Sequence, residues 1–246
     1  MTLRATVNRA YDLAIVAPAA LSALVPYRWR WSVLVAIGAV LTPFAGAIGR
    51  YGPGYSSVGL VTHREYALFY LLARATQLGI GFAPALSHDG LDALDAALSE
   101  GGPVLIAGVH APLLYLAGRY LIERGCDVVA FRDEGAMPVI GRPGSEYPGL
   151  EPGESIALLR LARAMTPGRV ITALIDHAPG RRAETIAIGP IRVNVAWPLL
   201  KLAADTGTVV LFFHPRLERG RVRIRWRRGD TVAAFADFLR ADSPGA

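Results

Sequence analysis

Residues 103–110 read PVLIAGVH and residues 111–120 read APLLYLAGRY. The uninterrupted apolar run predicts a strand covered on both faces, and Pro112 is typical of the first turn of a following helix. His110 is then expected in the crevice beyond the carboxyl end of that strand, where open parallel α/β sheets bind ligands. An imidazole there can act as a general base toward a hydroxyl or an amine. From this stretch alone, a histidine that caps a helix or fills the core is an equally good interpretation.

The composition limits the classes of protein to consider. A chain of 246 residues fits one large domain, and its single cysteine, Cys126, excludes an intramolecular disulfide and a cysteine-based zinc site. The net charge of +6 comes almost wholly from arginine, since Lys201 is the only lysine. Arginine suits anionic lipid, phosphate or nucleic acid, although a high genomic GC content would give the same bias. A hydrophobic share of 52% favours a membrane surface.

The first 50 residues are unusually apolar. Residues 13–27 and 31–49 carry no charge, and the second run is long enough to cross a bilayer. Three aromatic residues beside the intervening arginines resemble interfacial anchors: Tyr27, Trp29 and Trp31. Prolines interrupt both runs, so we expect a membrane-lying helical hairpin over residues 1–50, ahead of a true span or a buried soluble hairpin. A cleaved signal peptide is less favoured.

The rest of the chain, residues 51–246, alternates predicted strands and helices, which predicts a single α/β domain with a mixed, mostly parallel sheet flanked by helices. Strands are expected at 103–109, 127–131, 169–175 and 208–213, an edge strand at 221–227, and a pair of short extended segments within 185–193. Helices are expected at 64–78, 90–98, 155–165, 197–205 and 231–240, besides the one after His110.

Charged residues follow two of these strands and are expected at the same sheet edge as His110. Arg132, Asp133 and Glu134 follow the second strand, and a longer set follows the third: Asp176, His177, Arg181 and Arg182. Asp176, His177 and His214 are conceivable metal ligands, but no tight cluster is present and we expect no metal. His63 and His88 are expected to be helix caps or surface groups.

Common nucleotide and hydrolase signatures are absent from the sequence. It contains no Gly-x-Gly-x-x-Gly after a strand, no P-loop and no Gly-x-Ser-x-Gly elbow. The arginines within residues 221–228 are interpreted first as a solvated sheet edge, and second as a site for anionic headgroups or an acidic carrier protein. We expect no nucleic-acid partner, because Trp226 alone among the aromatic residues lies between these arginines.

The order of these pieces across residues 86–226 resembles the lysophospholipid acyltransferase superfamily, most closely its bacterial lipid A lauroyl/myristoyl acyltransferase branch. The matching segments are LDAL (91–94), GGPVLIAGVH (101–110), Phe131-Arg132, LIDH (174–177), IGP (188–190) and LAADTGTVV (202–210). The resemblance implies a glycerolipid acyltransferase-like fold at the cytoplasmic face of a bacterial inner membrane. It also implies transfer of a fatty acyl group from an acyl carrier protein or CoA thioester to a lipid, sugar or amine acceptor, with no tightly bound cofactor.

By the same resemblance, His110 is the base, Arg132, Asp176 and His177 shape the substrate site, and Arg181 and Arg182 hold phosphates. The family motif, however, is His-x4-Asp/Glu, and the acid position here is Tyr115. A neutral phenol can hydrogen-bond an imidazole but cannot offset the charge of an imidazolium.

Three explanations for this departure stay open. Asp133, Glu134 or Asp176 replaces the missing acid, His110 suffices alone for a reactive thioester, or catalysis has been lost. The alternatives to an acyltransferase are accordingly a catalytically impaired lipid- or carrier-protein-binding homologue and, behind it, a thioester hydrolase.

Overall fold

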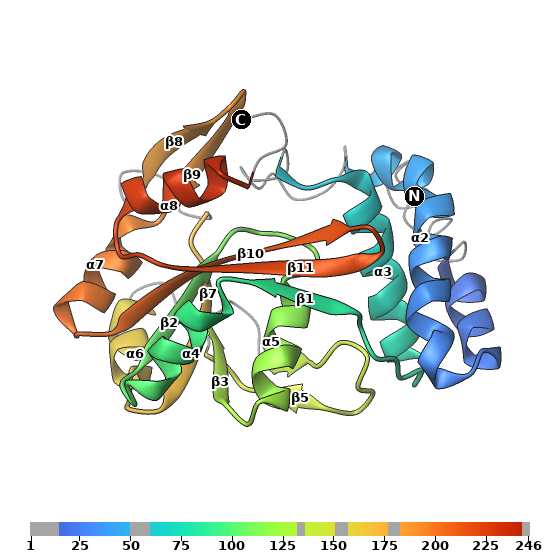
Figure 1. The fold of residues 1–246 in the computed structure, drawn as a ribbon, viewed down its shortest axis with the longest axis horizontal. Coiled ribbons are helices and arrows are strands. Elements are labelled where there is room, and N and C mark those ends of the chain that lie inside the picture. The colour runs from blue at the N-terminus through green and yellow to red at the C-terminus, as the bar shows by residue number, and fades with distance from the viewer. Residues whose placement is uncertain (1–14, 50–59, 132–135, 151–156, 177–182, 243–246) are drawn as a thin grey trace, which may run out of the picture.

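A seven-stranded sheet forms the centre of the molecule (Figure 1). The structure is a computed structural model that describes residues 15–49, 60–131, 136–150, 157–176 and 183–242. The strand order is β1-β11-β10-β2-β7-β3-β6, and of these neighbouring pairs only β10 and β11 are antiparallel. The prediction of a mixed, mostly parallel α/β sheet flanked by helices is confirmed.

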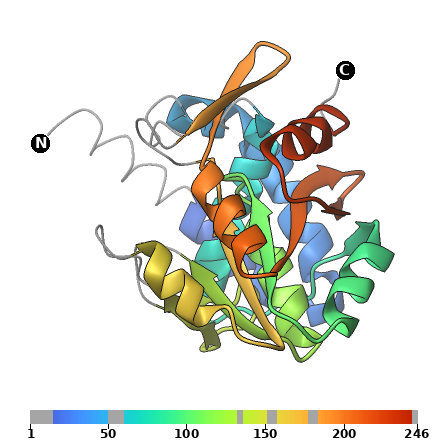
Figure 2. The same cartoon turned by 90° about the vertical axis from the view of Figure 1, so that its left-hand side faces the viewer.

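Five strands of this sheet lie close to predicted positions, and two, at residues 86–89 and 149–150, were not predicted. The seven strands are β1 (Leu86–Asp89), β2 (Val104–Gly108), β3 (Asp127–Phe131), β6 (Gly149–Leu150), β7 (Arg169–Leu174), β10 (Val209–Glu218) and β11 (Arg221–Arg228). Two short antiparallel pairs lie outside it: β4 (Met137–Pro138) with β5 (Glu146–Tyr147), and β8 (Glu184–Ile188) with β9 (Ile191–Val195). The β8–β9 pair, predicted as two extended segments, projects away from the sheet (Figures 1 and 2).

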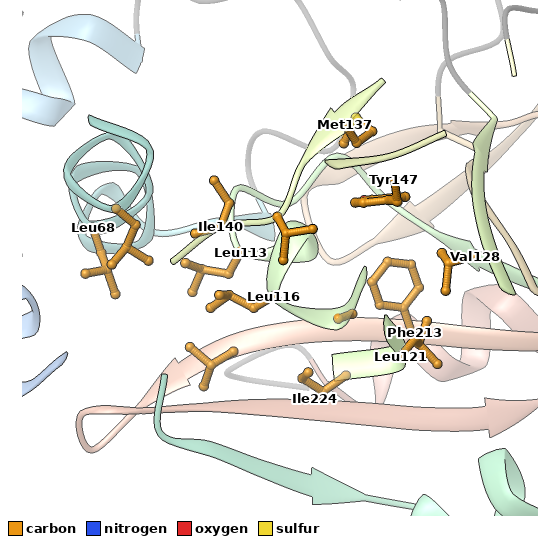
Figure 3. Close-up of a cluster of buried hydrophobic side chains, with 14 of the residues drawn as sticks. Leu68, Leu113, Leu116, Leu121, Val128, Met137, Ile140, Tyr147, Phe213 and Ile224 are labelled. Atoms are coloured by element: carbon orange, nitrogen blue, oxygen red, sulfur yellow. The ribbon is translucent and has the colours of Figure 1, made fainter. Parts of the chain in front are cut away.

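Helices cover both faces of the sheet. One core contains residues of α2 (Tyr27–Gly49), α3 (His63–Gln77), α4 (Leu91–Ser99) and α5 (Leu114–Glu123), and part of it is drawn in Figure 3. The other contains residues of α6 (Ala157–Ala164), α7 (Trp197–Asp205) and α8 (Val232–Arg240). All of β2 is buried, with Val104 and Ile106 in the first core and Leu105 and Ala107 in the second. The apolar run therefore does form a strand covered on both sides.

The amino-terminal segment differs from its prediction. Residues 15–21 are helical, a 3-10 turn η1 (Ser22–Leu24) follows, and α2 packs against α3. The expected apolar hairpin is not evident, and in the part of the chain that the structure describes no helix has the length and apolar character needed to cross a membrane. Trp31, predicted as an interfacial anchor, is instead buried and donates Nε1–H to the Gly220 carbonyl at 2.9 Å. The boundary predicted at residue 50 falls among residues 50–59, outside the described part.

The predicted edge of the sheet was also wrong, because β1 pairs with the outer side of β11. β1 has the sequence LSHD, and four residues without apolar alternation give no strand signal. His88 is therefore neither a cap nor a simple surface group. Its ring centre lies 4.1 Å from that of Tyr120, and its Nδ1 accepts a hydrogen bond from Trp226 Nε1 at 3.2 Å. Burial, the largest cause, and the charge of Arg124 lower the pKa of His88.

The end of β2 approaches β10 more closely than a side chain would permit. A Cβ atom on Gly108 would lie 2.3 Å from Cε1 of Phe213 and within 3.0 Å of two further atoms of that ring. The Phe213 ring thus packs directly on the backbone two residues before His110. Glycine is required here by space, not by an unusual backbone conformation.

We therefore expect Gly108→Ala to lower the free energy of unfolding by about 1–3 kcal/mol, the usual cost of overpacking a core. Denaturant titration followed by circular dichroism measures this change. Gly102→Ala is the control, because a Cβ there meets nothing within 4 Å. Equal stability of the two variants would show that Phe213 moves aside freely.

Candidate active site

His110 lies where β2 and β7 end side by side at the carboxyl edge of the sheet. Val104–Gly108 pairs in parallel with Val170–Leu174, and the Ile175 N–H continues this register by donating to the Gly108 carbonyl at 2.9 Å. His110 is two residues beyond β2, and Asp176 is two residues beyond β7. The parallel register therefore brings together two residues that are 66 positions apart in sequence.

Asp176 accepts two hydrogen bonds from the same histidine. Its Oδ2 accepts the backbone N–H of His110 at 3.0 Å, and its Oδ1 lies 2.5 Å from Nδ1 of the imidazole. The Asp176 side chain is fully buried, whereas 20% of the His110 side chain is exposed. A buried carboxylate is costly unless hydrogen-bonded, so His110 both satisfies this group and is held in place by it.

This geometry defines what the imidazole can do. When Nδ1–H is donated to a carboxylate, Nε2 is the basic nitrogen of the neutral ring. The carboxylate also stabilises the imidazolium that forms when Nε2 takes up a proton. Of the three acids that the sequence offered to His110, Asp176 contacts it, and Asp133 and Glu134 lie outside the described residues.

Tyr115 makes a different contact. It lies in the first turn of α5, half-buried, and its ring stacks on that of Phe69 in α3 with centres 5.2 Å apart and planes 17° apart. The phenol ring therefore helps to join α5 to α3. The role predicted for Tyr115 in catalysis stays a prediction.

Several predicted site residues lie outside the described part of the chain. They are Arg132, Asp133, Glu134, His177, Arg181 and Arg182. Arg132 follows directly after β3, which ends at Phe131, and His177 follows directly after Asp176. Their predicted roles as substrate contacts stay predictions.

A second histidine–aspartate pair was missed by the sequence analysis. Nδ1 of His214, in β10, lies 2.5 Å from Oδ2 of Asp242, beyond the end of α8. Arg223 and Arg225 of β11 both donate to Oδ1 of the same carboxylate, at 2.8 Å and 2.9 Å. The sequence offers no local signal for this cluster, because Asp242 is an isolated acid near the end of the chain.

This second pair is closed to solvent, with side chains that are only 2% (His214) and 0% (Asp242) exposed. Burial by itself raises the pKa of Asp242, but the hydrogen bonds and charges of His214 and Arg225 outweigh burial and lower that pKa to about 2. The arginines of β11 were interpreted as a solvated sheet edge, but two of them, Arg223 and Arg225, bind the buried carboxylate of Asp242. The cluster holds the end of α8 on the sheet.

The described residues contain no group of three or more His, Cys, Asp or Glu side chains arranged to hold a metal ion. Asp176 and His214, considered as ligands, are engaged by His110 and Asp242 respectively. No family model matches the sequence, and no curated protein matches it. The functional argument therefore depends on the residues of this site.

We expect Asp242→Asn to lower the free energy of unfolding at neutral pH by about 2 kcal/mol, since it removes an ionised carboxylate whose pKa is depressed by its partners. In the unsubstituted chain this stabilisation is present above pH 3.8, the ordinary pKa, and is lost as the pH falls toward about 2. Chemical denaturation between pH 7 and pH 2 measures both effects.

Asp237→Asn is the matched control. The Asp237 carboxylate is 63% exposed and forms a surface ion pair with Arg240. We expect a change within about 0.5 kcal/mol for such a surface pair. Similar losses in the two variants would contradict a structural role for the buried cluster.

Proposed function

We propose that the chain is a membrane-associated acyltransferase that moves a fatty acyl group from an acyl carrier protein or CoA thioester to a lipid, sugar or amine acceptor. The observation that carries this proposal is the hydrogen-bonded pair of His110 and Asp176 at the carboxyl edge of the sheet, with the carboxylate buried and the imidazole partly exposed. The acyl chemistry itself comes from the family resemblance of residues 86–226.

In the proposed reaction, Nε2 of His110 takes the proton of the acceptor hydroxyl or amine as that group attacks the thioester carbonyl carbon. The carbon–sulfur bond then breaks, and the leaving thiolate receives the proton from the imidazolium. Asp176 holds the ring orientation and stabilises its charged form during the interval. No oxidant, metal or further reactant is needed to balance these steps.

Asp176 supports an active enzyme over an impaired one, because it supplies the negative charge that Tyr115 lacks. The alternative, a lipid- or carrier-protein-binding homologue without turnover, is favoured by the phenol at the family's acid position and its stacking on Phe69. We further propose that Arg132 and His177 border the substrate site. Arg181 and Arg182 would hold phosphates of the donor or acceptor by charge-assisted hydrogen bonds, at the cytoplasmic face of a bacterial inner membrane.

A reconstituted assay with acyl thioester donors tests the role of the pair. We expect His110→Ala to abolish acceptor-dependent transfer. Asp176→Asn should lower kcat by up to about 10⁴-fold, the loss incurred when a serine-protease histidine loses its carboxylate partner. Asp205→Asn is the control, since this carboxylate is exposed and pairs with Lys201.

The outcomes of this assay separate the candidates. Acyl release without an acceptor, lost in His110→Ala, would identify a hydrolase instead. Lipid or carrier binding without turnover in the unsubstituted chain would identify an impaired homologue. Thermal unfolding of each variant shows whether the fold has survived the substitution.

Substitution of Tyr115 tests whether a second acid is needed. We expect Tyr115→Phe to retain activity within about threefold, because the ring can still stack on Phe69, and Tyr115→Asp to give no gain, because Asp176 already serves His110. Steady-state kinetics with one donor and one acceptor measure both. A rise in kcat in Tyr115→Asp would show that Asp176 does not supply the acid, and an inactive but folded Tyr115→Phe would show that the phenol takes part.

A further inference from the structure

A corner of the molecule near the amino terminus exposes large apolar side chains. It comprises the end of the helical residues 15–21, η1 and the first turn of α2, at the outer side of the α2–α3 layer (Figure 1, blue). Its exposed fractions are 59% for Leu21, 82% for Leu24, 51% for Tyr27 and 55% for Trp29. Four large apolar side chains exposed within nine residues of the chain are typical of an interaction surface.

Hydrogen bonds of Arg30 and Trp31, the two residues that follow the corner, fix its conformation. The Arg30 guanidinium donates to the carbonyls of Val25 at 3.0 Å and Gly81 at 2.9 Å, which ties the turn before α2 to the chain after α3. Trp31 is buried and bonded to Gly220. Because these two neighbours face inward, the helix directs Tyr27, Arg28 and Trp29 toward solvent.

The positive charge of the corner favours an anionic partner. Residues 13–64 contain no Asp or Glu, and exposed Arg28 lies with its guanidinium carbon 5.9 Å from the Trp29 ring centre. A segment that exposes leucine, tyrosine, tryptophan and arginine and itself contains no acid matches the interfacial region of an anionic bilayer, where aromatic rings lie at headgroup level and arginine pairs with phosphate. A symmetric contact between two copies would bring Arg28 near its own equivalent without a carboxylate to offset it.

We propose that this corner, defined by Leu21, Leu24, Tyr27, Arg28 and Trp29, docks on an anionic phospholipid surface. Leu24 and Trp29 enter the interface, and Arg28 contacts lipid phosphates. The inference rests on the proposed membrane-associated function and names the surface through which that association occurs. It requires no helix that crosses the bilayer.

Vesicle co-sedimentation of the full chain tests the proposal. We expect binding to phosphatidylcholine vesicles containing about one-third phosphatidylglycerol, and a loss of at least tenfold in partitioning for the double variant Leu24→Asp, Trp29→Ser. Arg28→Gln should weaken binding about fivefold, from roughly 1 kcal/mol per basic residue at such a surface. Brominated lipid should quench tryptophan fluorescence less in Trp29→Phe than in the unsubstituted chain.

A matched double variant, Leu159→Asp with Trp197→Ser, is the control. These residues are 50% and 41% exposed on α6 and α7, at the far side of the sheet from α2 (Figure 1). Circular dichroism and thermal unfolding confirm that each variant is folded. The proposal is overturned if the folded corner variant binds as the unsubstituted chain does, if both double variants lose binding equally, or if the unsubstituted chain does not bind anionic vesicles.

Acyl transfer from a short, water-soluble thioester to a soluble acceptor keeps this test separate from the proposed activity. We expect the corner variant to lose vesicle binding while retaining that soluble reaction. If the chain binds vesicles through the corner but shows no turnover, the proposed acyltransferase activity is refuted and the proposed docking surface is not. Sedimentation velocity identifies a dimer that dissociates in the corner variant, which would assign the surface to a second copy instead.

Discussion

The contact between Asp176 and His110 depends on the parallel pairing of β2 with β7. The two residues follow strands that end in register, so a single carboxylate reaches both the backbone N–H and the imidazole of the same residue. A buried carboxylate needs hydrogen-bond donors, and His110 provides two of them. On the other side of β2, β10 pairs in parallel with it, and the Phe213 ring of β10 packs directly on Gly108 at the end of β2.

The described part of the chain contains two histidine–aspartate pairs with the same Nδ1–carboxylate contact and different surroundings. His110 keeps part of its ring exposed and its acid is bound by the histidine itself, whereas His214 is sealed and its acid is shared with Arg223 and Arg225. Partial exposure permits a substrate to reach an imidazole, and burial among arginines fixes an ion cluster. The surroundings, not the pair, separate a candidate catalytic group from a structural one.

The start of α2 shows the same dependence on surroundings among aromatic residues. Tyr27, Trp29 and Trp31 are equivalent in sequence terms, all flanked by arginine within a few residues. Packing makes them different. Trp31 is buried and bonded to Gly220, and its neighbour Arg30 is bonded to Gly81. Tyr27 and Trp29 are more than half exposed. α2 is consequently both a part of the core and the boundary of the exposed corner that we propose to dock on lipid.

Local sequence was sufficient for the apolar strand β2, for β3, β7, β11 and the start of β10, for helices α3 to α8, and for the position of His110 at a strand end, because apolar periodicity and turn residues act over a few positions. The short strands β4, β5 and β6 were not predicted. Local sequence was also insufficient for β1, whose four residues gain strand structure only by pairing with β11. Asp176 was one of three acids that the sequence offered to His110, and no local pattern pointed to Asp242. Asp176 reaches His110 across 66 positions through strand order and register, and Asp242 reaches His214 across 28 positions through the packing of α8 on the sheet. Local sequence contains neither.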